Sequence, residues 1–309
     1  MALSTIMGRL TRVGPGHTVR ASKEGTLRSR LIGIVAALAV FGLIVAACAS
    51  KETPSGGGSG TPGITTIKGS GILTVGSCLD YKPFESVKPG SEEPTGFDVE
   101  LTNAIATKLD LKVEWVKANF NTIFTQVNQG KFDMVAAAVT ATGSVGKKRA
   151  QTVDFSDFYY NSQQGFTVNT EQTPDVKSVD DLTSGDVVGV QAGTTGEQWA
   201  KDNLAPKGIQ IKSYPAAPQA FTDLEAGNVV GVINDAPSSA AEIETRPSLE
   251  MVQQIDTNEK YAFAFAKGST ALVQAWNDGL QEVIADGTYT TIFTKYFPGV
   301  PVPAEFQPA

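Results

Sequence analysis

Histidine and cysteine are almost missing from this chain. Its 309 residues include one histidine, His17, and two cysteines, Cys48 and Cys78. So little imidazole leaves few groups for general-base catalysis or metal ligation, and we expect no metal and no other cofactor. At most one disulfide can form, so the fold must depend on packing rather than on covalent cross-links.

Long apolar runs are also scarce, and the one present lies near the start. "LIGIVAALAVFGLIVAA" (31–47) is preceded by six lysines and arginines and followed by Cys48. A basic lead, an apolar centre and small residues at the exit are the parts of a secretory signal. The tetrad Val-Ala-Ala-Cys (45–48) resembles a bacterial lipobox, in which the cysteine receives two fatty acyl chains of the palmitate type and becomes the new N-terminus.

Two alternatives stay open for this segment. Its seventeen residues are at the lower limit for a membrane-spanning helix. The long basic lead also leaves open a start at Met7. Either interpretation places the rest of the chain on the extracytoplasmic face of the cell membrane, tethered to it.

Positive charge becomes scarce once residues 1–47 are removed. They carry six of the 25 Lys and Arg and one of the 32 Asp and Glu, which leaves 19 against 31, a net charge of −12. His17 is lost as well. So acidic a protein is not expected to bind nucleic acid, because such binding depends on neutralising phosphates. The 262 residues that remain can bury a sizeable core in one or two domains.

Residues 48–63 contain no large apolar side chain and are rich in Gly, Ser, Thr and Pro, which is typical of a flexible tether. Two acyl chains on Cys48 would hold such a tether on a bilayer far better than one, at about 0.8 kcal/mol per buried CH₂. The expected layout is a signal peptide (1–47), a lipidated tether (48–63) and an acidic folded part.

The folded part alternates short β-rich runs with helical patterns, as α/β folds do. Strands are expected at 72–77, 111–116, 132–139, 187–191, 209–214, 229–235 and 261–269. Helices are expected at 96–111, 121–130, 195–204, 218–227 and, with a break at Gly287, 270–297. Asp98 is available near the start of the first helix as a cap, and Gly130 can end the second.

The pattern repeats weakly along the chain. In both "VNQGKFDMVAAAV" (127–139) and "LEAGNVVGVINDA" (224–236) a helix ends at glycine and an apolar strand follows. The repeat predicts two similarly built α/β lobes rather than one large sheet. Ligands of open α/β sheets bind beyond the carboxyl ends of the strands. The polar or aromatic residues at those ends are Cys78, Tyr81, Thr140, Thr142, Thr194, Thr195, Asn234 and Asp235.

Several stretches, in their expected order, resemble one family. They are "LDYKPFE", "GFDVEL", "QGKFDMVAAAVTAT", "KRAQTVDFSDFYY", "GVQAGTTGEQWA", "VINDAPSSAA" and "FAKGSTALVQAWNDGLQEVIADGTYTTIFTKYF". From about residue 66 to 298 the chain resembles the bacterial extracellular solute-binding proteins for polar amino acids, family 3. Each stretch is weak alone, and together they are specific.

The resemblance implies a two-lobe α/β fold of the periplasmic-binding-protein type (type II), with two crossover strands as the hinge. One lobe would hold 64–163 plus 264–309 and the other 164–263, and the ligand would be trapped between them by hinge closure. The implied protein is a monomeric lipoprotein, not an enzyme. It would capture a polar amino acid and deliver it to the membrane permease of an ABC importer.

The resemblance also implies roles for residues. Arg149 corresponds to the family's arginine, whose planar guanidinium can donate two parallel hydrogen bonds to the ligand's carboxylate. Thr194 and Thr195 would add the backbone donors of a helix N-terminus, and Asp235 would bind the ammonium. The remaining correspondences are Thr140 and Thr142, as small hydroxyl residues of the first lobe, and Tyr81 and Phe120, as rings that cover the ligand's side chain.

Each of these residues also has a purely structural interpretation. Arg149 by itself would be part of a solvated basic turn, and Asp235 by itself would be a helix N-cap. Tyr81 and Phe120 would be core or rim aromatics. Threonines at 194 and 195 would cap a helix on either interpretation.

The chain departs from the family in two places. "GSVGKK" (143–148) separates Thr142 from Arg149, which is about four residues more than is usual in the family. If this insertion bulges outward, Arg149 keeps its role; if it reorders the cleft, another group must bind the carboxylate. Cys78 stands where members that bind basic side chains often have aspartate. Because a thiol is no counter-charge and Asn234 can bind an amide or carboxylate, glutamine, glutamate or asparagine is favoured over lysine or arginine.

Two other functions remain open. A dehydratase on the same scaffold would need a carboxylic acid in the cleft with a raised pKa and no ammonium partner. An extracellular sensor domain would need a signalling domain or a second membrane segment.

Overall fold

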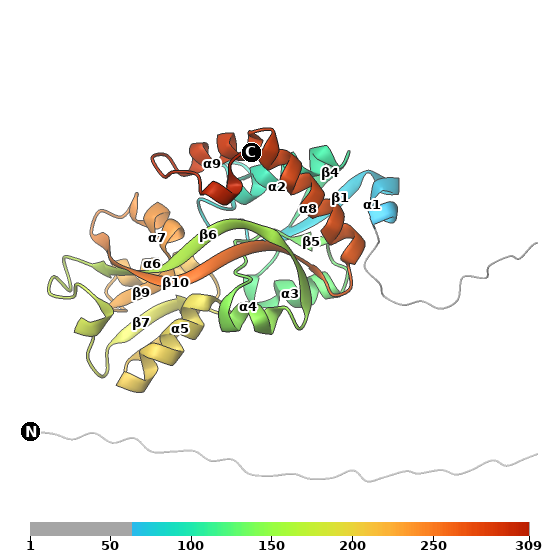
Figure 1. Cartoon of the computed structure of the whole chain (residues 1–309). Coiled ribbons are helices and arrows are strands. Elements are labelled where there is room, and N and C mark those ends of the chain that lie inside the picture. The colour runs from blue at the N-terminus through green and yellow to red at the C-terminus, as the bar shows by residue number, and fades with distance from the viewer. Residues whose placement is uncertain (1–63, 309) are drawn as a thin grey trace, which may run out of the picture. The chain divides into compact units, whose positions relative to one another are not determined.

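A computed structural model of the chain describes residues 64–308, in which helices and strands alternate (Figure 1). The predicted signal peptide, Cys48 and the tether lie outside the described residues. Within the described part, every helix is too short or too polar to cross a membrane.

The strands and helices have the following bounds. The strands are β1 (Ile72–Ser77), β2 (Ser86–Val87), β3 (Pro94–Thr95), β4 (Lys112–Lys117), β5 (Met134–Val135), β6 (Val153–Asn169), β7 (Val187–Gln191), β8 (Gln210–Tyr214), β9 (Gly231–Asp235) and β10 (Leu249–Ala266). The helices are α1 (Ile64–Ser70), α2 (Phe97–Lys108), α3 (Phe120–Asn128), α4 (Gly143–Arg149), α5 (Thr195–Asn203), α6 (Ala217–Glu225), α7 (Ala236–Ile243), α8 (Thr270–Ala285) and α9 (Thr288–Tyr296). The predicted break at Gly287 is confirmed.

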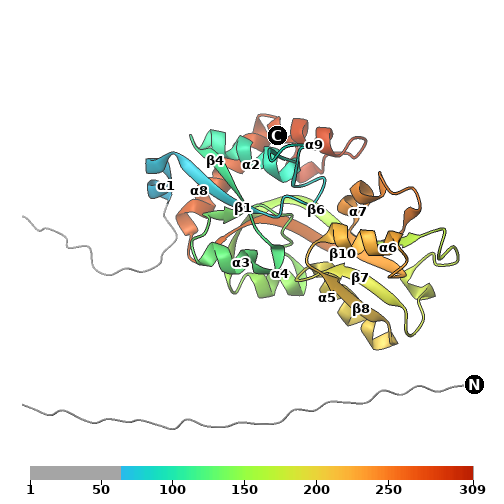
Figure 2. The ribbon, with the colours of Figure 1, turned by 180° about the vertical axis from the view of Figure 1, so that it is seen from behind.

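Two long antiparallel strands, β6 and β10, connect two lobes (Figures 1 and 2). The sheet runs in the order β4-β1-β5-β10-β6-β9-β7-β8. The first lobe contains β1, β4 and β5, and the second contains β7, β8 and β9; within each set the pairing is parallel. The two-lobe prediction with two crossover strands is thus confirmed. The expectation of two lobes instead of one large sheet needs a correction, because β6 and β10 run through both lobes and join them in one sheet.

The long strands lose regular pairing midway. The register of β10 against β6 shifts between Ile255 and Glu259. On β6, pairing with β9 begins at Gln164. The predicted lobe boundaries, 163/164 and 263/264, fall inside β6 and β10 and stay predictions.

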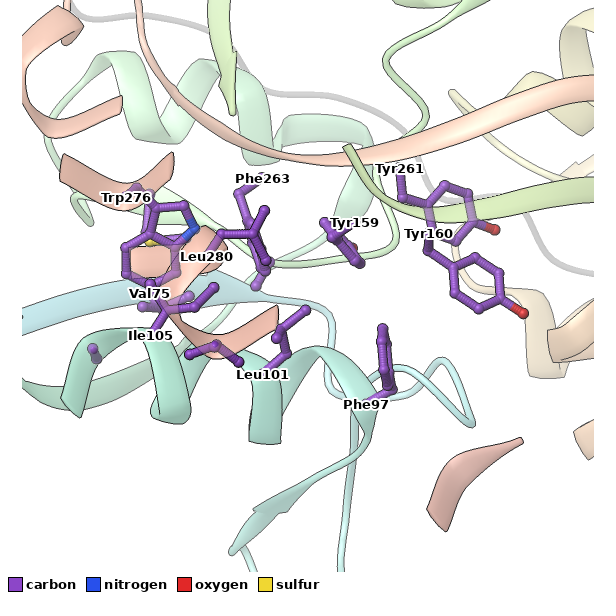
Figure 3. Packing of buried hydrophobic residues seen from close by; sticks show 14 of the residues in the cluster. Val75, Phe97, Leu101, Ile105, Tyr159, Tyr160, Tyr261, Phe263, Trp276 and Leu280 are labelled. Carbon is purple, nitrogen blue, oxygen red and sulfur yellow. The ribbon is translucent and has the colours of Figure 1, made fainter. Parts of the chain in front are cut away.

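Each lobe has its own apolar core. In the first lobe, side chains of β6 and β10 pack against α2 and α8, which contact each other (Figure 3). Phe263 stacks on Tyr159 with the ring centroids 4.4 Å apart and contacts Trp276 edge-on at 5.4 Å. The second lobe has separate clusters that include Ile233 and Phe221. Burying each such side chain contributes about 1.5–3 kcal/mol, so each lobe has a core that can stay packed while the lobes move on the long strands.

The apolar run 132–139 is not the long strand that the sequence predicts. Strand β5 ends at Val135, and Ala138 adopts a positive φ of 46°. The Ala138 N–H donates to Oδ2 of Asp98 at 2.8 Å. Asp98 was expected to cap α2, but Gly96 holds the cap position without a side-chain cap. The Asp98 carboxylate instead holds the loop around Ala138, which lines the space between the lobes.

The insertion before Arg149 is a short helix. Residues 143–149 form α4, and Arg149 is its last residue. Arg149 is buried, with 8% of its surface exposed, which excludes the solvated-turn interpretation. The insertion therefore folds on itself and leaves the arginine directed into the protein.

Candidate functional site

A cavity lies at the carboxyl ends of the strands, between the lobes. Its walls are formed by Cys78, Tyr81, Glu85, Phe120, Ala137, Ala138, Thr140, Arg149, Gln191, Thr194, Thr195 and Asp235. Eight of the ten predicted site residues are in this set.

Arg149 forms one end of the cavity. Its Nη1 donates to the carbonyl oxygen of Thr140 at 2.8 Å, and its Nη2 donates to that of Gly193 at 3.0 Å. The guanidinium carbon lies 5.2 Å from the ring centroids of both Phe120 and Phe124. Burial lowers the pKa of Arg149 to about 10, so the side chain keeps its charge at neutral pH. Two of its five N–H donors are engaged with these carbonyls, which leaves donors for an anion.

The N-terminus of α5 lies beside this guanidinium. Thr194 is the N-cap: its Oγ1 accepts from the Glu197 N–H at 3.2 Å and donates to the Gln191 carbonyl at 2.8 Å. Thr195 begins the helix. A helix N-terminus presents free N–H groups and a partial positive charge. Together with Arg149 it makes this end of the cavity suitable for a carboxylate.

Asp235 contributes a carboxylate to the cavity wall, in contrast to the cation of Arg149. It holds the N-cap position of α7 without a side-chain cap, so the capping interpretation is wrong. Its carboxylate accepts instead from the Gln164 amide and the Tyr261 hydroxyl. Burial, together with the nearby charge of Glu259, raises the pKa of Asp235 to about 7. A cation placed beside it would favour its ionised form.

Cys78 and Glu85 provide two further polar groups of the wall. Burial raises the pKa of the Cys78 thiol well above its usual value, so it presents a neutral thiol to the cavity. Glu85 is 1% exposed, and neither of its carboxylate oxygens has a hydrogen-bond partner within residues 64–308. Burial and the charges of Asp98, Asp80 and Asp235 raise the pKa of Glu85 well above its usual range. Sequence reasoning missed this residue, although it ends the quoted stretch "LDYKPFE".

Two predicted site residues lie behind the wall. Thr142 Oγ1 donates to the Asn258 carbonyl at 3.2 Å and accepts from the Lys260 N–H at 3.1 Å. Asn234 is buried, and its Oδ1 accepts from the Tyr81 hydroxyl at 3.0 Å, a bond that joins the two lobes. Neither belongs to the lining set.

Comparison with known proteins gives a consistent result. The bacterial extracellular solute-binding proteins, family 3, match residues 73–299. A probable histidine-binding protein of Neisseria gonorrhoeae is 32% identical over 268 residues, which cover 85% of this chain and 94% of that protein. An L-cystine-binding protein of Bacillus subtilis is 30% identical over 238 residues, covering 75% and 83%.

Solved structures agree with the fold. An ancestral arginine-binding protein bound to arginine has a TM-score of 0.68 and 34% identity, covering 74% of this chain and 98% of that one. An ancestral arginine-binding protein bound to glutamine has a TM-score of 0.65 and 33% identity over 74% and 98% of the chains. An ancestral amino acid-binding protein described as a precursor of cyclohexadienyl dehydratase has a TM-score of 0.69 and 33% identity over 76% and 99%.

Proposed function

Because this chain belongs to the bacterial extracellular solute-binding proteins of family 3, we propose that it captures one amino acid between its lobes and delivers it to an ABC importer. The observation that carries this proposal is the pairing of opposite environments in one cavity. Arg149 and the start of α5 suit an α-carboxylate, and Asp235 suits an α-ammonium. No bond needs to be made or broken for this task.

Cys78 and Glu85 in the cavity wall determine which side chains of the ligand are favoured. The preference for glutamine, glutamate or asparagine rested on Cys78 and Asn234, and it left out Glu85. A buried carboxyl without partners is stabilised by a donor or a cation and disfavours a second carboxylate. We therefore place arginine, histidine and glutamine before glutamate. The arginine and glutamine complexes of ancestral arginine-binding proteins and the probable histidine-binding relative support this order.

Titration of the full chain with the twenty L-amino acids by calorimetry tests both levels of the proposal. We expect binding of at least one donor-bearing amino acid with micromolar or tighter affinity. Tightest binding of glutamate would overturn the role of Glu85 alone. Absence of binding for all twenty would overturn capture of an amino acid.

We also propose that the protein is a monomeric lipoprotein anchored to the extracytoplasmic face of the cell membrane through Cys48. The tetrad at 45–48 and the Gly- and Ser-rich tether support this. Substituting Cys48→Ala should move the protein from the membrane to the soluble fraction, because the acyl chains are lost. Membrane fractionation with immunoblotting measures the distribution, and unchanged ligand affinity is the control. A variant that stays on the membrane would favour the membrane-spanning alternative.

A dehydratase remains the second candidate, because one observation favours it. Glu85 is a cavity carboxyl with a raised pKa, as acid–base chemistry requires, and one similar structure is a dehydratase precursor. Mass spectrometry of compounds recovered after incubation separates the two functions. An unchanged amino acid supports capture, and a dehydrated product would support the enzyme.

A further inference from the structure

Glu259 lies where both lobes and both long strands meet, although it is not part of the cavity wall. It is on β10 at the register shift and only 4% exposed. Its Oε2 accepts from the hydroxyls of Thr140 at 2.7 Å and Thr195 at 2.9 Å. Thr140 belongs to the first lobe and Thr195 to the second. This single carboxylate therefore joins the two sides of the cleft.

The other oxygen of Glu259 is also engaged. Oε1 accepts from the Gln164 amide and from the Thr257 hydroxyl, each at 2.8 Å. The same Gln164 nitrogen donates to Asp235. Glu259 is thus connected to the ammonium end of the cavity through one amide group. With four donors on two oxygens, its position is tightly defined.

These hydrogen bonds fix the direction in which the hydroxyls of Thr140 and Thr195 point their protons. A hydroxyl has one proton to donate and two lone pairs that accept. Thr140 and Thr195 both line the cavity, and both give their proton to Glu259. Thr195 Oγ1 also accepts from the Gln164 amide nitrogen at 3.2 Å, which leaves it one lone pair. Towards the cavity each hydroxyl can therefore act only as an acceptor. Asp235 lines the same cavity, and it accepts from the same Gln164 nitrogen as Thr195. Such a group of acceptors suits a donor, and the donor common to all amino acids is the α-ammonium.

We propose that Glu259 is a positioning residue for the ligand's ammonium group. It orients the hydroxyls of Thr140 and Thr195 as acceptors and so completes, with Asp235, a set of oxygen acceptors around that group. This inference rests on the proposed function and extends it. It also assigns the two hydroxyls to the ammonium, while Arg149 and the backbone of α5 are left to the carboxylate.

The test uses two substitutions and a matched control in the full chain. Glu259→Ala removes all four acceptor contacts, whereas Glu259→Gln keeps an amide oxygen that can still accept from both threonines. Glu250→Ala removes the charge of an exposed glutamate on the same strand. The probes are L-arginine, L-histidine and L-glutamine, each paired with its analogue that lacks the α-amino group. Calorimetry and competition at millimolar concentration give the affinities.

We expect Glu259→Ala to weaken binding of the amino acids at least tenfold and to change binding of the analogues less than threefold. Glu259→Gln should recover most of the loss, and Glu250→Ala should bind like the wild type. Equal losses for amino acid and analogue, or no loss for either, would overturn the positioning role. A wild-type chain that binds none of the twenty L-amino acids would instead overturn the proposed function, and this inference with it.

Discussion

The two charged ends of the cavity are built differently. At one end, Arg149 donates to two backbone carbonyls and lies against two phenylalanine rings, and its pKa, although lowered by burial to about 10, leaves it charged. At the other end, burial and the nearby Glu259 raise the pKa of Asp235 to about 7, so it is ionised only in part at neutral pH. One end is a fixed cation, and the other gains its full charge when a partner arrives.

The largest effect is expected at the fixed end. Arg149→Ala should weaken amino acid binding by about 100-fold, because losing the partner of a desolvated charge costs on the order of 2–5 kcal/mol. Calorimetry measures the loss. Arg149→Lys is the matched control, because it keeps the charge but not the planar pair of donors. Its affinity should lie between those of the wild type and Arg149→Ala. Unchanged affinity in the alanine variant would mean that the carboxylate is bound elsewhere.

Asp235→Asn should have a smaller effect that depends on pH. At pH 8 we expect a loss of at least about tenfold, since the ammonium loses its ionic partner. At pH 6 the loss should shrink, because the wild-type carboxyl, with its pKa raised by burial to about 7, is then mostly protonated. Affinities of both proteins at the two pH values decide this. An equal loss of affinity at both pH values would mean that Asp235 is not the group that becomes protonated between pH 8 and pH 6.

The pH dependence of the wild type follows from the same group. Between pH 8 and pH 6 the ionised fraction of a carboxyl with its pKa at about 7 falls roughly tenfold. Affinity for L-glutamine should fall by a similar factor, and binding should release protons in calorimetry near pH 7. Asp235→Asn serves as the control and should give a flat profile.

The stability of the ligand-free protein should change in the same pH range. The folded pKa of Asp235 is raised above its unfolded value, so its contribution to stability is complete below about pH 4 and is lost as the pH rises through about 7. Thermal unfolding should therefore show a wild-type melting temperature that falls from pH 5 to pH 8. The fall should be smaller in Asp235→Asn.

The smallest effect is expected at the side-chain wall, as a change in selectivity. Glu85→Gln should reduce the preference for L-arginine over L-glutamine by about tenfold, roughly 1.4 kcal/mol, because a cation loses its counter-charge. Titration with both amino acids gives the ratio. Glu93→Gln, at an exposed glutamate paired with Lys88, is the control. An unchanged ratio would remove Glu85 from the selectivity of the site.

The sequence predicts helices and strands well where the hydrophobic pattern and the turn or cap residues at its ends agree. β7 and β9 are apolar runs bounded by turn residues, and Thr194 caps α5 as expected. It fails where a tertiary contact overrides the pattern. The apolar run 132–139 reads as a strand, but a buried carboxylate 40 residues earlier holds Ala138 in a loop. The segment "GSVGKKR" lacks apolar periodicity, and its helix could not be predicted from spacing.

The same distinction applies to the site. Asp235 and Thr195 lie at a strand end and a helix start, positions that chain order reveals. Arg149 was predicted only through the resemblance to the family. Glu85 and Glu259 are buried by packing, and a charged residue in a loop or on a strand edge ordinarily points to solvent. No local signal marks them as inward-facing. Thr142 and Asn234 have the right sequence neighbours, but their side chains bind protein partners behind the wall.

The bond from Arg149 to the carbonyl of Gly193 crosses from one lobe to the other. Arg149 is thus both the proposed partner of the ligand's carboxylate and a hydrogen-bond contact between the two lobes. Under the proposed function, separation of the lobes by an importer would break this hydrogen bond and withdraw the start of α5 from the ligand's carboxylate in one movement. Release would then follow from opening of the lobes alone, without a competing solute to displace the ligand.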